Sequence, residues 1–167
     1  CDYGTVNPTS MGLWGRQGDI WYRVKEFYFD SRKEMRQMTD EEYAAQMAKL
    51  AGGREIAAVI VDPAAASFLE TLRRKGWRVK KAENDVLRGI RLTADLLKNG
   101  KIVICENCGD CLREMDEYVW DLGCGAGDRV KKENDHAMDD MRYFAATVLA
   151  GRQEGFGAWA VERRQSK

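Results

Sequence analysis

Three aspartates and the single histidine stand where a strand end or a helix face would present them. Asp2 lies in the first strand-like segment, and Asp62 ends a short apolar run. Asp139 follows His136 by three residues on the last helical segment. Carboxylate oxygens are the ligands that Mg²⁺ and Mn²⁺ prefer in proteins. By this pattern alone, solvated charge is the favoured interpretation in a chain with 27 acidic residues, and a divalent-metal site is the alternative.

The last helical segment, predicted from about residue 134 to 150, has two distinct faces. Its apolar stripe consists of Ala137, Met141, Phe144 and Val148. Its second face gathers His136, Asp139, Asp140 and Tyr143. Because residues three and four positions apart are neighbours on a helix, we expect His136 and Asp139 to lie side by side.

The segments that must position these residues alternate between strands and helices. The first 29 residues predict a hairpin with turn residues at 17–19, and Thr39 with Glu42 predicts a capping box before a helix that ends at 52–53. Further strands are expected at 55–61, 77–79 and 101–105, and further helices at 68–76, 86–97, 107–121 and 134–150. This order predicts an α/β fold, a mixed central sheet flanked by helices.

The composition describes one globular domain without a global electric field. A chain of 167 residues can bury one hydrophobic core, and its 27 basic and 27 acidic residues cancel. The longest aliphatic run, residues 57–61, is too short to span a bilayer, so we expect no membrane partner. Residues 1–150 are predicted to form the domain and residues 151–167 a loose tail.

Basic residues gather in two local clusters, before residue 82 and just before the last helix. For both clusters, a DNA-facing role and a solvated helix end are equally good interpretations. The candidate DNA-binding residues are Arg74, Lys80, Lys81, Arg129, Lys131 and Lys132.

Four cysteines at 105, 108, 111 and 124 have a spacing that also suggests a zinc or iron–sulfur site. Cys108 shares a predicted helical stripe with Leu112, Met115 and Val119, and Cys105 ends a predicted buried strand. Small core residues occupy such positions, so we favour core thiols over metal ligands. The odd total of five cysteines favours reduced thiols over a disulfide framework.

Four stretches, in this order, resemble a known family. They are DYGTVNPT at 2–9, VIVDP at 59–63, a KIVI strand leading to a Tyr-Val-Trp helix end at 101–120, and DHAMDDMRY at 135–143. Together they resemble the C-terminal nuclease domain of large terminase subunits from tailed bacteriophages and prophages, over almost the whole chain. The resemblance implies an RNase H-like fold.

The resemblance also implies roles for particular residues. Asp2, Asp62 and Asp139 correspond to the ligands of two divalent ions, Mg²⁺ or Mn²⁺, and His136 to a further active-site residue. Asp140 stands where the family often has a small residue, so either Asp139 or Asp140 is the ligand. Two such ions about 3.5–4 Å apart hydrolyse a phosphodiester by activating water and stabilising the leaving oxygen.

The function implied is that of an endonuclease that cuts concatemeric double-stranded DNA with little sequence preference. The partners implied are an N-terminal ATPase domain, a small terminase subunit and a portal, in the cytoplasm of the host bacterium. The chain has no phosphate-binding-loop motif, so we expect the ATPase outside it. The alternatives are another RNase H-like nuclease, such as a junction resolvase or a ribonuclease H, and a noncatalytic zinc-binding interaction module.

Overall fold

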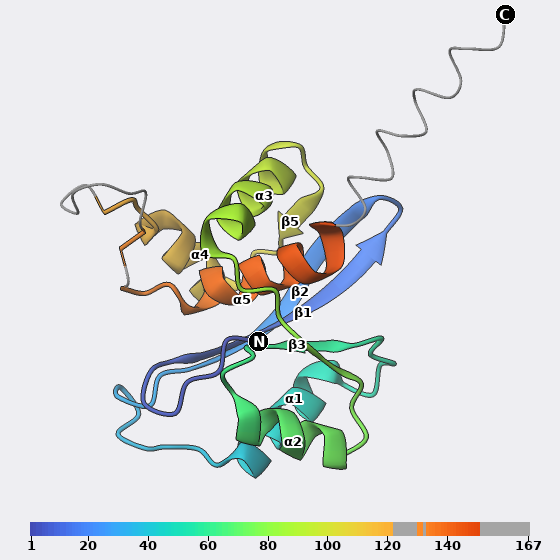
Figure 1. The fold of residues 1–167 in the computed structure, drawn as a ribbon, viewed down its shortest axis with the longest axis vertical. Helices are drawn as coiled ribbons and strands as arrows, with labels where there is room; N and C mark the ends of the chain where they lie inside the picture. Colours follow the sequence, from blue (N-terminus) through green and yellow to red (C-terminus); the bar gives the residue numbers. More distant parts are fainter. Residues whose placement is uncertain (122–129, 132, 151–167) are drawn as a thin grey trace, which may run out of the picture.

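A long β-hairpin forms one part of the sheet in the computed structural model, which describes residues 1–121, 130–131 and 133–150. Strands β1 (Thr9–Gln17) and β2 (Ile20–Phe29) pair antiparallel, and Gly18 takes the positive φ of 59° that the tight turn between them requires. Strand β5 (Ile102–Ile104) then pairs parallel with the start of β2. The hairpin is therefore flanked on one side by a strand that comes much later in the chain (Figure 1).

A second pair of strands carries one of the predicted carboxylates. Strands β3 (Val59–Val61) and β4 (Val79–Lys81) are parallel, and all three residues of β3 are buried. Asp62 follows β3 directly, so the end of this buried strand delivers its side chain.

The first two residues of the chain join the two strand groups. The backbones of Asp2 and Ser10 in β1 exchange two hydrogen bonds of 2.9 Å. On the other side, the nitrogen of Cys1 donates to the carbonyl of Ile60 at 2.6 Å, and the amide of Asp62 donates to the carbonyl of Cys1 at 3.2 Å. The strands thus form one mixed arrangement in which Asp2 and Asp62 are neighbours.

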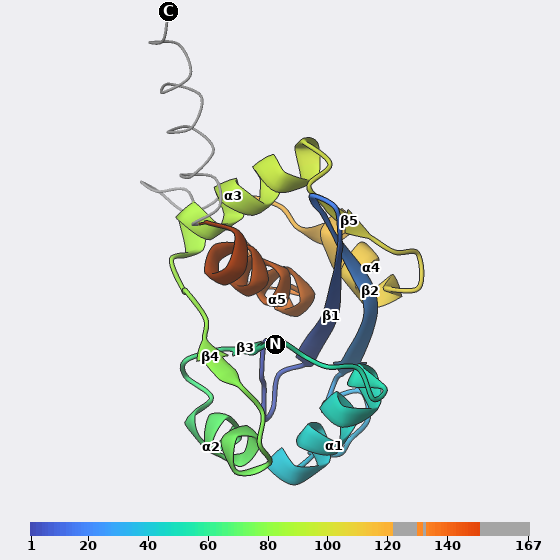
Figure 2. The same ribbon diagram turned by 90° about the vertical axis from the view of Figure 1, so that its right-hand side faces the viewer.

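Helices pack around this arrangement. They are α1 (Asp40–Ala51), α2 (Ala66–Arg74), α3 (Val86–Lys98), α4 (Gly109–Glu117) and α5 (His136–Phe144), the last continued by a π-helical turn at Ala145–Leu149. Helix α5 contacts β1, β3, α3 and α4, whereas α1 contacts α2 and the hairpin. Figures 1 and 2 show α1 and α2 at one end of the molecule and α3, α4 and α5 at the other.

Aromatic side chains fix these helices to the strands. The rings of Trp14 in β1 and Phe144 in α5 stack with centroids 4.1 Å apart. At the other end, Tyr3 stacks on Phe68 of α2 at 4.6 Å, and Tyr43 of α1 packs edge-on against both rings. The loop that follows Asp2 is therefore anchored in the core between α1 and α2.

The predicted α/β fold with a mixed sheet and flanking helices is confirmed, and one helix face is corrected. In α4 the buried residues are Cys111 and Glu114, and Val119, which was predicted on the apolar stripe, is 52% exposed. Val119 lies beyond the end of α4 at Glu117, and Glu114 is buried because its carboxylate has partners in β2 and α5.

Some predictions fall on residues outside the described part of the chain. These are the predictions for Cys124, Arg129 and Lys132 and for the tail at 151–167. Within the described residues, no helix has the length and apolar character needed to cross a membrane.

Candidate active site

Four of the predicted site residues line one cavity of about 480 Å³. Asp2 comes from the dipeptide between the strand groups, and Asp62 from the end of β3. His136 and Asp139 come from the first turn of α5. Further walls are provided by the loop after Asp2, the loop after β2 and the segment before α5. The fold therefore brings together the three carboxylates and the histidine that the sequence singled out.

Asp2 and His136 form a pair within the cavity. Nδ1 of His136 lies 2.9 Å from Oδ2 of Asp2, and both side chains are mostly buried. Burial raises the pKa of Asp2 more than the contact with His136 lowers it. Burial by itself would lower the pKa of His136, but the hydrogen bond and the charge of Asp2 raise it above the ordinary value. His136 is therefore easier to protonate than a free histidine.

The turn after β3 orients Asp62. Its Oδ1 accepts a hydrogen bond of 2.9 Å from the amide of Ala64, and its carbonyl accepts one of 3.1 Å from the amide of Ala65. Pro63 disfavours helical backbone at the residue before it, so the chain leaves the strand in this turn. Local sequence thus sets the rotamer of this carboxylate.

Asp139 lies in the first turn of α5, where the helix dipole favours a negative charge. Its Oδ1 accepts a hydrogen bond of 3.0 Å from Nε of Arg142, and its amide donates to the carbonyl of Asp135 at 2.8 Å. Asp135 itself stands directly before the helix. Asp139 is thus a buried carboxylate fixed by its own helix.

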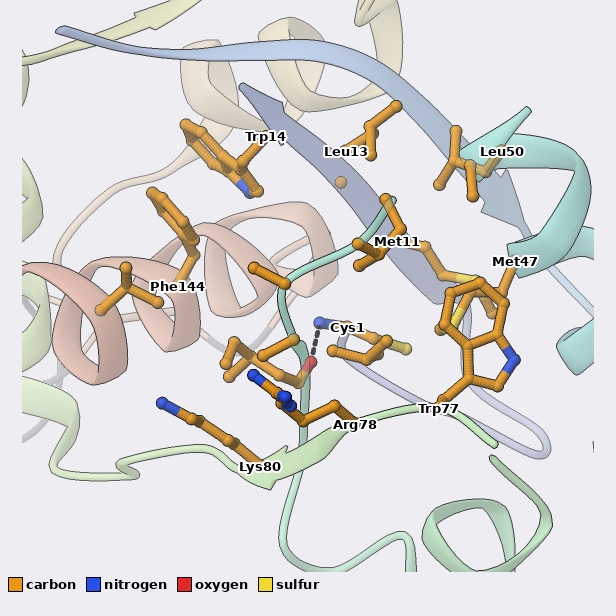
Figure 3. A pocket seen from close by; sticks show the side chains of 18 of the residues that line it. Cys1, Met11, Leu13, Trp14, Met47, Leu50, Trp77, Arg78, Lys80 and Phe144 are labelled. Atoms are coloured by element: carbon orange, nitrogen blue, oxygen red, sulfur yellow. Dashed lines mark hydrogen bonds between the residues drawn. The ribbon is translucent and has the colours of Figure 1, made fainter. Parts of the chain in front are cut away.

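Asp140 faces away from this cavity, although the sequence grouped it with Asp139 on one helix face. Its Oδ2 accepts a hydrogen bond of 2.7 Å from Nη1 of Arg23, and its Oδ1 lies 2.7 Å from the nitrogen of Cys1. It lines a second cavity of about 480 Å³, which lies between β1, β3 and α5 (Figure 3). The grouping is wrong for Asp140 because successive helix residues are turned by about 100°.

Two cavity residues received no role from the sequence. Tyr143 was placed on the correct helix face, and burial followed by the charges of Asp2, Asp62 and Asp139 raises the pKa of its hydroxyl. Arg32 follows the hairpin, and its Nη2 donates to Oδ1 of Asn7 at 2.9 Å. The i to i+4 spacing from Asp139 to Tyr143 was a usable signal, whereas nothing local in the sequence points to Arg32.

The candidate DNA-binding residues on helices and loops are engaged with acidic neighbours. Nη2 of Arg74 lies 3.6 Å from the carboxylate of Glu41, and Nζ of Lys131 lies 2.6 Å from that of Glu133. Neither cation lines the carboxylate cavity, although Glu133 does. The other two candidates of this group, Arg129 and Lys132, lie outside the described residues.

One of the two candidates on β4 lies at the second cavity. Lys80 and Lys81 are exposed, and Lys80 lines that cavity beside Arg78 and Trp77 (Figure 3). Figure 3 shows these side chains opposite the apolar residues of β1. The structure therefore does not bring β4 cations to the predicted site.

The described cysteines of the 105–111 cluster are mostly core residues. Cys108 and Cys111 are fully buried and pack with Ala137, Met138 and Met141 of α5. Burial raises the pKa of the Cys108 thiol to about 11 and that of Cys111 to about 12, so both stay protonated at neutral pH. Cys124, the fourth member of the spacing, lies outside the described residues.

The donor atoms that line the cavity suit a divalent cation. Asp2, Asp62 and Asp139 offer carboxylate oxygens, the donors that suit Mg²⁺ and Mn²⁺. Within the described part of the chain, no three histidine, cysteine or acidic side chains lie close enough to hold one ion. Asp2 contacts His136 through Oδ2 and Asp139 contacts Arg142 through Oδ1, so a shared cation would draw the carboxylates closer together.

Mixed strands bring Asp2, from a bridge to β1, and Asp62, after β3, beside an aspartate at the start of α5, as expected for an RNase H-like domain. The family model of the terminase RNaseH-like domain matches residues 22–147, and the chain belongs to this family.

Relatives of known structure have the same architecture. The large terminase of a thermophilic bacteriophage, solved in complex with ADP, is 47% identical, with a TM-score of 0.88 over 90% of this chain and 39% of that chain. The nuclease domain of the large terminase of bacteriophage SPP1, solved with bound Mn, is 18% identical, covers 85% of this chain and 80% of that chain, and has a TM-score of 0.63. At 18% identity, the similarity to the SPP1 domain supports the fold alone.

One curated relative extends the comparison to a complete protein. The large terminase subunit of Escherichia phage T5 is 23% identical over 160 residues, which are 90% of this chain and 35% of the T5 protein. The chain thus spans little more than a third of the T5 protein and of the thermophilic phage terminase that it matches.

Proposed function

We propose that this chain is the nuclease domain of a phage DNA-packaging terminase, a metal-dependent endonuclease that hydrolyses double-stranded concatemeric DNA with little sequence preference. The observation that carries the proposal is the cavity in which Asp2, Asp62, Asp139 and His136 meet. Two relatives support it, the large terminase of the thermophilic phage and the SPP1 terminase nuclease domain with bound Mn.

The carboxylates and the histidine have distinct tasks in this proposal. Asp2, Asp62 and Asp139 would together hold two divalent ions, Mg²⁺ or Mn²⁺. Bound ions of this kind supply an activated water and a stabilised leaving oxygen on opposite sides of the phosphorus. When Nδ1 of His136 donates to Asp2, Nε2 is the atom that exchanges a proton with water or a phosphate oxygen.

Contacts to the DNA backbone need cations near a cavity that is otherwise acidic. Arg32 lines this cavity, and its planar guanidinium suits a phosphate oxygen pair. Arg74, Lys80, Lys81 and Lys131, with Arg129 and Lys132, remain candidates for more distant phosphates. Because the net charge of the chain is zero, we expect weak binding that falls as salt rises.

The whole-protein context is also part of the proposal. The chain would work beside an N-terminal ATPase domain, a small terminase subunit and a portal in the cytoplasm of the host bacterium. Tethering by the other domain raises the effective DNA concentration, so a weakly binding nuclease still cuts DNA that is being packaged.

The test is cleavage of supercoiled plasmid by the 167-residue chain. We expect nicking and linearisation with Mn²⁺ or Mg²⁺ and none with chelator. Asp62→Asn should abolish cutting with an unchanged thermal unfolding midpoint. Asp95→Asn, which removes an exposed carboxylate from α3, is the matched control and should cut like the wild type. Full activity of Asp62→Asn at equal purity would contradict the proposed site.

Substrate comparison separates this proposal from other RNase H-like nucleases. Linear duplex DNA, a four-way junction and an RNA–DNA hybrid would be offered at equal concentration. A packaging nuclease should cut the duplex at many sites, whereas a strong preference for the junction or the hybrid would favour a resolvase or a ribonuclease H.

A further inference from the structure

Arg142 is a buried arginine that does not line the candidate site but contacts Asp139, which does. Its side chain is 3% exposed, and it follows Asp139 by one helical turn on α5. Nε donates to Oδ1 of Asp139 at 3.0 Å, and Nη2 donates to Oδ1 of Asn84 at 3.2 Å. The guanidinium also lies 4.6 Å from the ring centroid of Tyr143. The arginine therefore links two cavity residues to the loop before α3.

A glycine in α3 makes the space for this arginine. A Cβ on Gly89 would lie 2.6 Å from Cγ and 2.9 Å from Cδ of Arg142, which is closer than real Cβ contacts allow. Glycine weakens a helix interior relative to alanine, so local helix stability does not favour it there. The close approach of α3 to the arginine stem explains why this position lacks a side chain.

Packing alone does not account for an arginine at this buried position against Gly89. Its Nη1 is buried and has no hydrogen-bond partner among the described residues. An apolar side chain would fill the same space without burying a charge and an unsatisfied donor. The contact that an apolar residue could not make is the charge-assisted hydrogen bond to Asp139.

We infer that Arg142 is a positioning residue that fixes the carboxylate of Asp139 in the cavity. Gly89 leaves the space for its side chain, and Asn84 accepts a hydrogen bond from its guanidinium. This inference rests on the proposed function, because it assigns to Asp139 the role of a metal ligand. Partners that orient a ligand typically contribute a factor of about 10–100 in metal affinity or activity.

The test is direct Mn²⁺ binding, followed through the EPR signal of free Mn²⁺, with thermal unfolding measured on every variant. Gly89→Ala displaces the arginine from outside the cavity, and we expect the dissociation constant of Mn²⁺ to rise about 10-fold or more. Gly109→Ala is the matched control, because a Cβ at this helical glycine meets nothing within 4 Å. The control should bind Mn²⁺ like the wild type.

A double-variant cycle identifies the arginine as the carrier of the effect. Arg142→Ala removes the atoms that Gly89→Ala would strike, so the double variant should bind Mn²⁺ no more weakly than Arg142→Ala alone. Asn84→Ala is the substitute test if Arg142→Ala does not fold. Because Asn84 is exposed, this variant should fold, and we expect it to weaken Mn²⁺ binding as well.

The outcomes separate this inference from the proposed function. Wild-type Mn²⁺ affinity in folded Gly89→Ala and Asn84→Ala, or additive losses in the cycle, would overturn the positioning role. Mn²⁺ binding by the wild type without DNA cleavage would contradict the nuclease proposal and leave the positioning role to be decided by the binding data. A wild-type chain that binds no Mn²⁺ would overturn both.

Discussion

The two faces of helix α5 place consecutive aspartates in opposite circumstances. Asp139 lines the candidate active site and has an arginine of its own helix, Arg142, as a partner. Asp140 is 2% exposed and is held by Arg23 from β2 and by the nitrogen of Cys1. Arg23 in turn is fully buried and reaches Glu26 at 3.4 Å.

The difference shows how one helix can serve both the core and a reactive site. On the core face, a buried carboxylate is tolerated because the guanidinium of Arg23 contacts one of its oxygens and the nitrogen of Cys1 contacts the other. On the cavity face, Asp2 contacts His136 and Asp139 contacts Arg142, and these contacts hold the carboxylates beside the cavity. Both Arg–Asp pairs require a glycine beside the arginine, Gly12 next to Arg23 and Gly89 next to Arg142.

Asp140→Asn tests the core face and should produce the largest effect. It leaves the buried guanidinium of Arg23 with only the more distant Glu26 as counter-charge, so we expect the free energy of unfolding to fall by about 3–5 kcal/mol. Urea unfolding followed by circular dichroism measures this loss. Where the variant is folded, it should still cut DNA, and loss of cutting in folded protein would make Asp140 the ligand in place of Asp139.

The same variant has a signature in acid. Burial opposes ionisation of Asp140, but neighbouring donors, among them the charged guanidinium of Arg23, hold its pKa below the ordinary value of 3.8. A lowered folded pKa contributes stability that is present above the unfolded pKa and lost as pH falls through the folded pKa. Asp140→Asn should therefore show a shallower loss of stability below about pH 4.

Asp139→Asn tests the cavity face and should have the next largest effect. Partners that only orient a metal ligand contribute about 10–100-fold, so loss of the ligand Asp139 itself should cost more than about 100-fold in rate, or about 2.7 kcal/mol. Plasmid cleavage at saturating Mn²⁺ measures the rate, and the unfolding midpoint should stay near that of the wild type. A stable variant with full activity would exclude Asp139 from the site.

His136→Ala should weaken cleavage less than Asp139→Asn does. The histidine contacts Asp2 and supports the site, so we expect a loss of about 10-fold, or about 1.4 kcal/mol. Because Asp2 raises the pKa of His136, the variant should also lose any step in the pH–rate profile above about pH 6.5. Equal collapse of both variants would show that the histidine is indispensable.

The sequence predicted most of what depends on local pattern. The capping box of α1 forms as expected, with the amide of Glu42 donating to Thr39 at 3.2 Å. The convergence of Asp2, Asp62 and Asp139 was also predicted, by resemblance and not by local pattern.

The remaining features depend on tertiary partners that a helical wheel does not contain. Asp139 and Asp140 differ only in which neighbour each meets, and the partner of Asp140 in β2 is 117 residues away. The burial of Glu114 likewise depends on Tyr28, which is 86 residues away. Such distant contacts decide which polar residue is buried, so the sequence pattern alone missed them.

Glu114→Gln should have the smallest effect on the free energy of unfolding, and this effect should depend on pH. Oε1 of Glu114 accepts a hydrogen bond of 2.5 Å from the Tyr28 hydroxyl, and Oε2 accepts one of 2.5 Å from the amide of Ala137 in α5. Glutamine can accept from the same amide and donate to the tyrosine oxygen, so we expect a change within about 1 kcal/mol.

Burial raises the pKa of Glu114 above its ordinary value of 4.5, despite the lowering by its hydrogen bonds. A raised folded pKa contributes stability that is present below the unfolded pKa and lost as pH rises through the folded pKa. The glutamine variant is free of this loss, so its stability relative to the wild type should increase from about pH 4.5 upward. Urea unfolding of both proteins across this range measures the trend. If the relative stability of the variant falls as pH rises, ionised Glu114 stabilises the start of α5. In that case the charge of Glu114 would matter as the charge of Asp140 does, and the two buried carboxylates would no longer differ.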